Sequence, residues 1–288
     1  MKSLPLTIRD LNEAAESLGA PPNRYGESMS SPAGLGMFIW EWSECDGGSL
    51  QTILSKCSRC NISWVAVHFP DVTTERVQAF HDAGIYVAAW LYCVPGDPTY
   101  IPQAVKVAAL GVDAILPDCE IEWEELDGKP ADRRPEALAF AEALRNALGP
   151  NVWIGNCGAW QWPDKHPAYP DHAFGKFWDA GLPERYWTMF PPSEATPKEA
   201  LDESDREWSD PMNVNAYKVL IPIGSAFDGS IQGGQLLRPS DVADFLNRQP
   251  TCALWSWQHA TPTIWALLEQ RAQTEVSPTA STDRPPST

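Results

Sequence analysis

The stretch VDAILPDCEIEW, residues 112–123, decides the fold that we expect for this chain. It begins as an apolar run directly after Gly111, which is typical of a parallel strand buried on both faces. It ends in Asp118 and Glu120, and because side chains alternate along a strand, this spacing points both carboxylates to the same side. Acids at the carboxyl end of a barrel strand are typical of an active site. The stretch therefore predicts a buried strand and a candidate site.

Short apolar strands alternate with amphipathic helices along the chain from Gly36 onward. Eight such units predict a (β/α)₈ TIM barrel, because a closed sheet leaves no unpaired edge. The alternative is a doubly wound open sheet, which favours a G-x-G-x-x-G turn after an early strand, whereas residues 42–50 read WSECDGGSL. The expected strands are residues 36–42, 62–69, 85–92, the opening stretch, 151–156, 185–190, 217–225 and 252–258.

The chain of 288 residues, of which 43% are hydrophobic, is long enough for one such barrel. We expect the barrel to occupy residues 36–272. Residues 1–35 are predicted to form an N-terminal arm with a short helix and a linker rich in Pro, Gly and Ser. Residues 273–288, rich in Ser, Thr and Pro, are predicted to be a disordered tail.

The net charge of −17 argues against nucleic acid and anionic membrane surfaces as partners, because both attract basic proteins. The sequence has no run of about twenty apolar residues that could span a membrane. The first twenty residues lack the apolar segment of a secretory signal, so we expect the protein to be cytoplasmic at synthesis. A neutral ligand is the better expectation.

Seven cysteines form an odd set, and several lie in or beside expected strands, so we interpret them as reduced, buried thiols. Cys57 and Cys60 form a C-x-x-C, but no second cysteine or histidine pair follows at zinc-finger spacing. We therefore expect neither a metal nor a cofactor.

In a barrel, the residues at the carboxyl ends of the strands gather around one mouth. Here they are mainly carboxylates, amides and aromatic rings, which predicts a sugar-binding cleft. Some of the fourteen tryptophans would serve such a cleft, although core packing is the better explanation for most of them, and for Trp257 packing and sugar stacking compete evenly. Besides the catalytic candidates Asp118 and Glu120, the expected substrate-binding residues are Trp40, Glu41, Trp90, Tyr92, Asn156, Tyr186, Trp257 and Gln258.

Several short motifs in a fixed order resemble the glycoside hydrolase family 25 lysozymes and their barrel relatives. They are LYCVPGDP (91–98), DCE (118–120) and WSWQHA (255–260). Together with FIW (38–40) and IPIGS (221–225), they resemble still more closely a group of bacterial and phage-encoded proteins with a similar barrel. The resemblance covers about residues 36–270.

The resemblance implies hydrolysis of a β-linked amino sugar, such as the muramyl–glucosaminyl bond of peptidoglycan, with Glu120 as general acid. It implies that Asp118 stays ionised and stabilises an oxocarbenium-like centre or an acetamido nucleophile. In place of the aspartate that such enzymes carry on strand one, this chain has Glu41, and the expected strand six has no carboxylate before Glu194. Strand four also resembles the D-x-x-D-x-D-x-E motif of family 18 chitinases, but Leu116 replaces one acid, which argues against a chitinase.

Two functions remain open from the sequence. The first is a lysozyme-like hydrolase, as a phage or prophage product released by lysis or carried in a particle. The second is a non-catalytic structural or glycan-binding barrel of a phage or surface assembly, with residues 1–34 as the segment that contacts an assembly partner. A metal-dependent hydrolase has little support, because strand one lacks the H-x-H start common in such barrels.

Overall fold

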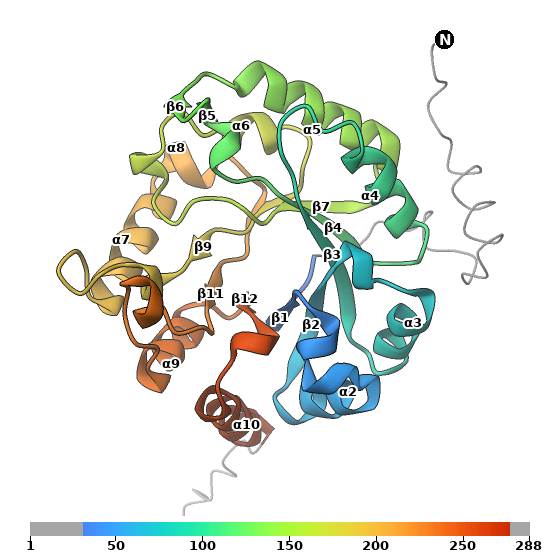
Figure 1. Ribbon diagram of the computed structural model, residues 1–288, viewed down its shortest axis with the longest axis vertical. Helices are drawn as coiled ribbons and strands as arrows, with labels where there is room; N and C mark the ends of the chain where they lie inside the picture. The colour runs from blue at the N-terminus through green and yellow to red at the C-terminus, as the bar shows by residue number, and fades with distance from the viewer. Residues whose placement is uncertain (1–30, 277–288) are drawn as a thin grey trace, which may run out of the picture.

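A computed structural model describes residues 31–276 and shows a ring of parallel strands surrounded by helices, which confirms the predicted TIM barrel (Figure 1). The predicted arm falls mostly on residues 1–30, and the predicted tail mostly on residues 277–288; both segments lie outside the described residues. The last helix continues to Val276, beyond the expected end of the barrel at residue 272.

The sixth and seventh positions of the ring are each formed by two short strands, β8 and β9 at the sixth and β10 and β11 at the seventh. The sheet closes because β8 pairs with β7 and β10, and β9 pairs with β11. At the other side of the ring, β12 pairs with β1, with Leu35 opposite Cys252. The strands are β1 (Leu35–Ile39), β2 (Ile62–His68), β3 (Tyr86–Tyr92), β4 (Ala114–Asp118), β7 (Trp153–Asn156), β8 (Ala180–Gly181), β9 (Glu184–Arg185), β10 (Val219–Leu220), β11 (Ile223–Ser225) and β12 (Cys252–Trp255).

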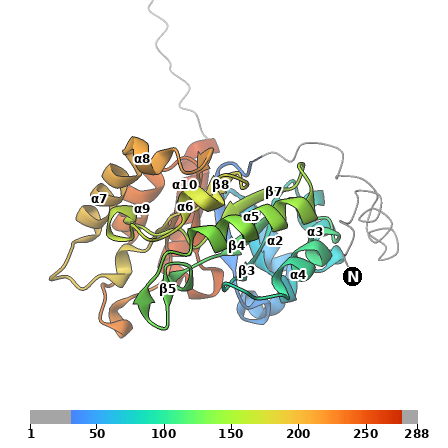
Figure 2. The same cartoon turned by 90° about the horizontal axis from the view of Figure 1, so that it is seen from above.

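Helices cover the outside of the ring and follow the strands in chain order (Figures 1 and 2). Several have the expected terminal signals. Thr196 and Glu199 form a reciprocal capping box at the start of α7, and Gly149, with φ of 81°, ends α5. The helices are α2 (Leu50–Arg59), α3 (Thr74–Asp82), α4 (Tyr100–Ala108), α5 (Arg134–Leu148), α6 (Asp171–Phe174), α7 (Pro197–Ser209), α8 (Pro211–Val214), α9 (Pro239–Arg248) and α10 (Pro262–Val276). None in residues 31–276 is both long and apolar enough to cross a membrane.

Two apolar clusters form the core. The larger lies between the sheet and the helices, and the smaller fills the interior of the ring with alternate side chains of the strands. Gly36 makes room for the interior ring of Trp64, because a Cβ at this position would lie 2.0 Å from the indole. The interior residues include Phe38, Trp64, Ala88, Trp90, Leu116, Trp153, Leu182 and Ile223. The barrel is therefore packed below its mouth.

Strand six differs from the prediction. We expected residues 185–190, but the sixth position of the ring holds β8 and β9, and residues 187–189 form a 3₁₀ turn. Leu182 and Pro183 interrupt the strand, since a proline has no N–H to donate to a neighbouring strand. This shift brings Glu184 into the sheet, with important consequences for the site.

A small antiparallel hairpin extends the loop between β4 and α5. It consists of β5 (Glu125–Leu126) and β6 (Lys129–Pro130), joined by Asp127 and Gly128, which both have positive φ. Glu124, directly before the hairpin, is 6% exposed and pairs with His166 at 2.6 Å, which ties the loop to the segment after β7.

Candidate active site

Three carboxyl groups meet at the carboxyl end of the barrel. Asp118 ends β4, Glu120 follows it after one residue, and Glu184 begins β9. One oxygen of each group lies within 4.8 Å of an oxygen of the other two. The structure thus brings together the two acids that the sequence singled out and adds a third that the sequence analysis missed. We call Asp118, Glu120 and Glu184 the acid trio.

The acid trio has few hydrogen-bond donors. Asp118 is only 6% exposed, and its Oδ1 has no partner among the described residues. Glu184 accepts a hydrogen bond from the hydroxyl of Tyr186 at 3.3 Å. Within residues 31–276, no lysine or arginine forms an ion pair with any of the three. Buried carboxylates without cations or donors are costly to ionise.

Burial therefore raises the pKa of all three groups. It raises the pKa of Asp118 to about 8, and the Glu120 carboxylate beside it adds to the effect. The pKa of Glu120 is raised by burial and by Glu122. Burial, Asp118 and Glu120 hold the pKa of Glu184 well above its ordinary value. Near neutral pH the acid trio consequently shares at least one proton, which corrects the expectation that Asp118 simply stays ionised.

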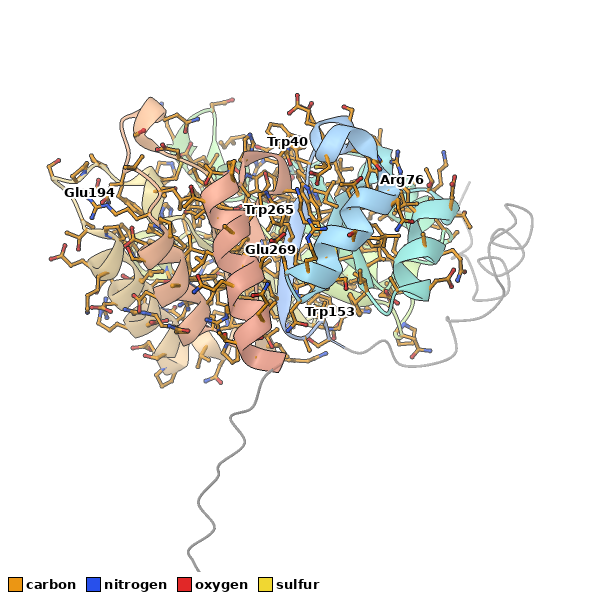
Figure 3. All side chains as sticks on the ribbon, turned by 90° about the horizontal axis from the view of Figure 1, so that it is seen from below. Trp40, Arg76, Trp153, Glu194, Trp265 and Glu269 are labelled. Atoms are coloured by element: carbon orange, nitrogen blue, oxygen red, sulfur yellow. The ribbon has the colours of Figure 1, made fainter. Side chains whose placement is uncertain are left out.

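Aromatic rings also lie at the carboxyl ends of β1, β3 and β12. The rings of Trp40 and Trp255 lie 6.0 Å apart, and Trp255 meets Trp90 edge to face at 5.0 Å. Trp40 is 40% exposed and Trp255 is half-buried, whereas Trp90 is 3% exposed and donates to the carbonyl of Ile39. Figure 3 labels Trp40 and Trp153 toward opposite ends of the barrel. Trp40 and Trp255 offer ring faces to a ligand, and Trp90 supports them.

Trp255, rather than Trp257, is the strand-eight tryptophan of the mouth. Trp257 is 2% exposed, its N–H donates to Asp46 at 2.9 Å, and its ring packs against Trp265. In this position Trp257 has no free face for a sugar, so of the two readings weighed from the sequence the geometry favours packing. Gln258 accepts from the backbone N–H of Trp40 at 3.4 Å and thereby ties strand eight to strand one.

Asn156 is another predicted substrate-binding residue that the fold buries. It is fully buried and donates to the hydroxyls of Tyr169 and Tyr217 at 2.8 and 3.0 Å. Tyr169 in turn donates to the carbonyl of Cys119, between the two strand-four acids. The sequence predicted Asn156 in contact with substrate, and the structure instead places it in a network that holds the Asp118–Glu120 turn.

The remaining predicted residues lie at the rim. Tyr92 is 41% exposed and pairs in register with Asp118 across β3 and β4. The hydroxyl of Tyr186 contacts Glu184, and its ring packs edge-on against Phe227. Glu41 is exposed and is not part of the acid trio. The backbone after β7 packs directly against the Asp118–Glu120 turn at Gly158. A Cβ on Gly158 would lie 2.3 Å from the Cys119 carbonyl oxygen.

One oxygen from each acid could also share a bound cation, since the three ligand atoms lie within 4.8 Å of one another. Carboxylate oxygens are the ligands that calcium and magnesium prefer. The sequence analysis expected no metal at all, and the trio is the place in residues 31–276 where this expectation can be tested.

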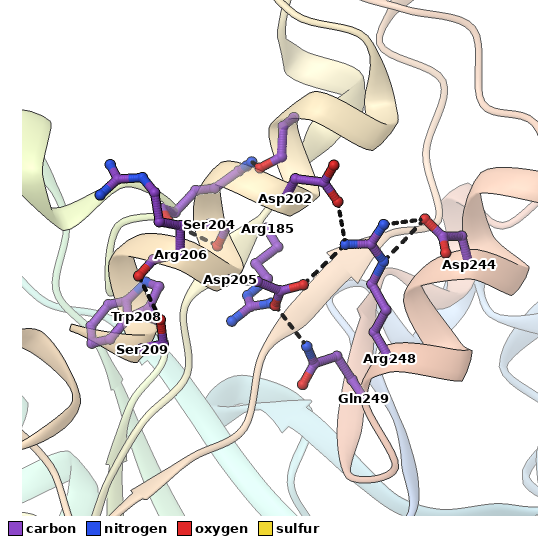
Figure 4. A network of polar contacts seen from close by, with 12 residues as sticks. Arg185, Asp202, Ser204, Asp205, Arg206, Trp208, Ser209, Asp244, Arg248 and Gln249 are labelled. Atoms are coloured by element: carbon purple, nitrogen blue, oxygen red, sulfur yellow. Dashed lines mark hydrogen bonds and ion pairs between the residues drawn. The ribbon is translucent and has the colours of Figure 1, made fainter. Parts of the chain in front are cut away.

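A second group of acids lies outside the ring, between β9, α7 and α9 (Figure 4). Arg185, the neighbour of Glu184 on β9, points outward to Asp205. Arg248 pairs with Asp205 at 3.0 Å, with Asp202 at 2.8 Å and with Asp244 at 2.8 Å. Hydrogen bonds from Lys198 and Arg248 lower the pKa of Asp202. We call Arg185, Asp202, Asp205, Asp244 and Arg248 the outer network.

No protein-family model and no curated protein sequence matches this chain. Solved structures do match. An endo-1,4-beta-D-mannanase from Thermotoga petrophila shares 9% identity with a TM-score of 0.55, over 84% of this chain and 99% of that one. The human pseudo-chitinase YKL-39, with retained chitooligosaccharide binding, shares 6% identity with a TM-score of 0.55, over 84% and 100%. A putative deoxyribose-phosphate aldolase from Toxoplasma gondii shares 15% identity with a TM-score of 0.52, over 91% and 95%.

These structures share the barrel and differ in what their names say they do, so the likeness shows the TIM-barrel fold alone. At such low identity it says nothing more about this chain. Any statement about its reaction must come from the residues of the mouth.

Proposed function

We propose that this protein is a glycoside hydrolase that cleaves a β-linked amino-sugar glycan at the acid trio. The single observation that carries the proposal is the position of Glu184 within 4.8 Å of Asp118 and Glu120. The sequence analysis expected the acid of strand six to be missing, and Glu184 supplies one. A protonated acid beside ionised carboxylates is the arrangement that glycoside hydrolysis requires.

Each acid has a distinct role in this proposal. Glu120 donates its proton to the glycosidic oxygen as the bond to the anomeric carbon breaks. The carboxylate of Glu184 attacks that carbon when the protons of the acid trio reside on Glu120 and Asp118, and the hydrogen bond that Glu184 accepts from Tyr186 favours its ionised form. Asp118 shares a proton with its neighbours and stabilises positive charge on the ring. Water then releases the sugar, and Glu120 accepts the proton from this water.

The spacing of the acids favours retention of the anomeric configuration. Inverting enzymes hold their two carboxyl groups about 6.5–9.5 Å apart to admit a water, and retaining enzymes about 5–5.5 Å apart. The nearest oxygens of the acid trio lie within 4.8 Å of one another, which is close to the shorter of these two separations.

The test compares wild-type protein with the Glu120→Gln variant on chromogenic chitooligosaccharides and on peptidoglycan suspensions. Peptidoglycan is included because the sequence motifs resemble lysozyme-type barrels. We expect release by the wild type and a loss of about 10²–10⁴-fold in the variant, the usual contribution of a general acid. Equal inactivity of both proteins on these two substrates and on a de-N-acetylated chitooligosaccharide would contradict the proposal.

A second candidate function is glycan binding without cleavage, as a component of a phage particle or surface assembly contacted through residues 1–34. The exposed position of Glu41, outside the acid trio, favours this candidate, because the strand-one acid of lysozyme-type barrels is then absent from the site. Binding of oligosaccharide that is unchanged in Glu120→Gln, without hydrolysis by either protein, would favour it over the enzyme.

A further inference from the structure

We infer that the glycan carries free, positively charged amino groups, and that the mouth binds one of them between the acid trio and the tryptophan rings. The inference rests on the proposed function and names the substrate class of the same site. It selects a de-N-acetylated amino-sugar polymer over its neutral N-acetylated form and over glycans that carry carboxylates.

The first support is a pair of buried carboxyl oxygens without hydrogen-bond partners at the carboxyl end of β4. Oδ1 of the 94%-buried Asp118 has no hydrogen-bond partner among the described residues. Oε2 of Glu122, a fourth carboxyl group beside the acid trio, is also buried without a partner. A ligand that fills this space must bring donors, and an ammonium group has three of them and no acceptor.

The second support is charge. Cations on the helices and loops that follow the strands are paired with other acids: Lys56 with Asp46 at 2.5 Å, Arg76 with Asp71 at 3.4 Å, and Arg133 with Glu136 at 3.0 Å. Burial lowers the pKa of His68, which keeps its imidazole neutral near pH 7. A carboxylate on the ligand would therefore meet like charge with no cation to balance it, whereas an ammonium group would meet opposite charge.

The third support is the aromatic side. Trp40 and Trp255 present partly exposed rings at the same end of the barrel as the acids, with centroids 6.0 Å apart. The electron-rich face of tryptophan attracts cations as well as the apolar face of a sugar. Carboxyl groups and indole faces at one end of the barrel are a favourable combination for a protonated amino sugar.

The experiment measures the affinity of the Glu120→Gln variant, which binds without cleaving, for two tetrasaccharides of equal length. One is built of glucosamine and the other of N-acetylglucosamine. We expect the amine to bind about tenfold more tightly at low salt and the preference to shrink at high salt. Binding of the amine should also release protons near pH 7, because a cation lowers the pKa of the acids that it contacts. Titration calorimetry in two buffers of different ionisation enthalpy detects this release.

Two further substitutions in the same background locate the effect. Glu122→Gln should reduce the preference for the amine, because it removes one carboxylate beside the trio. Glu194→Gln, an exposed acid on the loop after β9, should leave the preference unchanged and serves as the matched control. Equal loss in both would show that only the overall charge matters, and would overturn the inference.

The remaining outcomes separate this inference from the proposed function. Cleavage of N-acetylated chitooligosaccharide by the wild type, with equal affinity of the variant for both tetrasaccharides, would overturn the inference and leave the proposed function intact. Failure to bind or cleave either sugar would overturn both. Tight binding of calcium or magnesium alone, without any preference for the amine, would assign the acids to a metal and also overturn the inference.

Discussion

Two adjacent residues of β9 lie in opposite electrostatic surroundings. Glu184 points into the mouth, where burial and two further acids raise its pKa, and Arg185 points outward into a network of aspartates. Each aspartate of the outer network forms an ion pair with an arginine at an N···O distance of 3.0 Å or less. In the acid trio, no acid has a cationic partner among the described residues. Paired charges stabilise the fold, whereas unpaired buried charges reduce stability and are typical of functional sites.

Alternation of side chains explains how β9 can carry both an acid of the mouth and an arginine of the outer network. Successive side chains of a strand point to opposite sides, so a Glu–Arg pair at the sixth position of the ring sends one charge to the interior and the other to the helices. Arg185 is 4% exposed, and its contacts with Asp205 on α7 fix the position of β9. The outer network thus holds in place the strand that carries Glu184.

The largest effect that we expect is on activity, from a change in the acid trio. Glu184→Gln should lower kcat by about 10²–10³-fold, because the amide cannot attack the anomeric carbon. Glu194→Gln, at an exposed acid after β9 that lies outside the acid trio, should leave kcat unchanged. Steady-state hydrolysis of a chitooligosaccharide measures both variants. Comparable activity of Glu184→Gln and wild type would show that Glu184 is not the nucleophile and would contradict the role given to the acid trio.

A smaller effect, now on stability, is expected from the outer network. Asp205→Asn should lower the free energy of unfolding by about 2 kcal/mol, because it leaves the buried Arg185 without its anionic partner. Urea denaturation followed by circular dichroism measures this change. Activity per folded molecule should stay near that of wild type. As a control, Asp132→Asn, which removes an exposed ion pair with Arg134, should have little effect on stability.

The last effect that we expect is on the pH dependence of stability. The pKa of Asp118 is raised from 3.8 to about 8 in the folded protein, so the folded state binds more protons than the unfolded chain between these values. Stability from this group is present at low pH and is lost as the pH rises from about 4 to about 8. The melting temperature of wild type should fall over this interval, and that of Asp118→Asn should fall less. Parallel curves for the two proteins would argue that Asp118 titrates normally.

The first half of the barrel was predictable because its strands are long and uninterrupted. The observed bounds of β2, β3 and β4 lie within the expected apolar runs, and Asp118 and Glu120 were identified by their spacing alone. The spacing of two residues places both carboxylates on one side even though the strand ends at Asp118. Here local sequence pattern and tertiary structure agree.

The second half was less predictable because its strands are short and broken. Pro183 interrupts the sixth strand, so the sequence Ala180–Arg185 has no continuous apolar run, and the aromatic residues after it gave a stronger but misleading signal. Glu184 was therefore placed outside the sheet. Which of two tryptophans, Trp255 or Trp257, faces the mouth also depends on where the strand ends, which alternation alone does not define. Both errors concern strand boundaries.

The most direct test follows the anomeric configuration of the products by proton NMR during hydrolysis of a partially N-acetylated glucosamine oligosaccharide. If the closely spaced acids Asp118, Glu120 and Glu184 act together as proposed, the first product to accumulate is the β-anomer, which retains the configuration of the substrate. The α-anomer as first product, or no hydrolysis at all, would contradict the account.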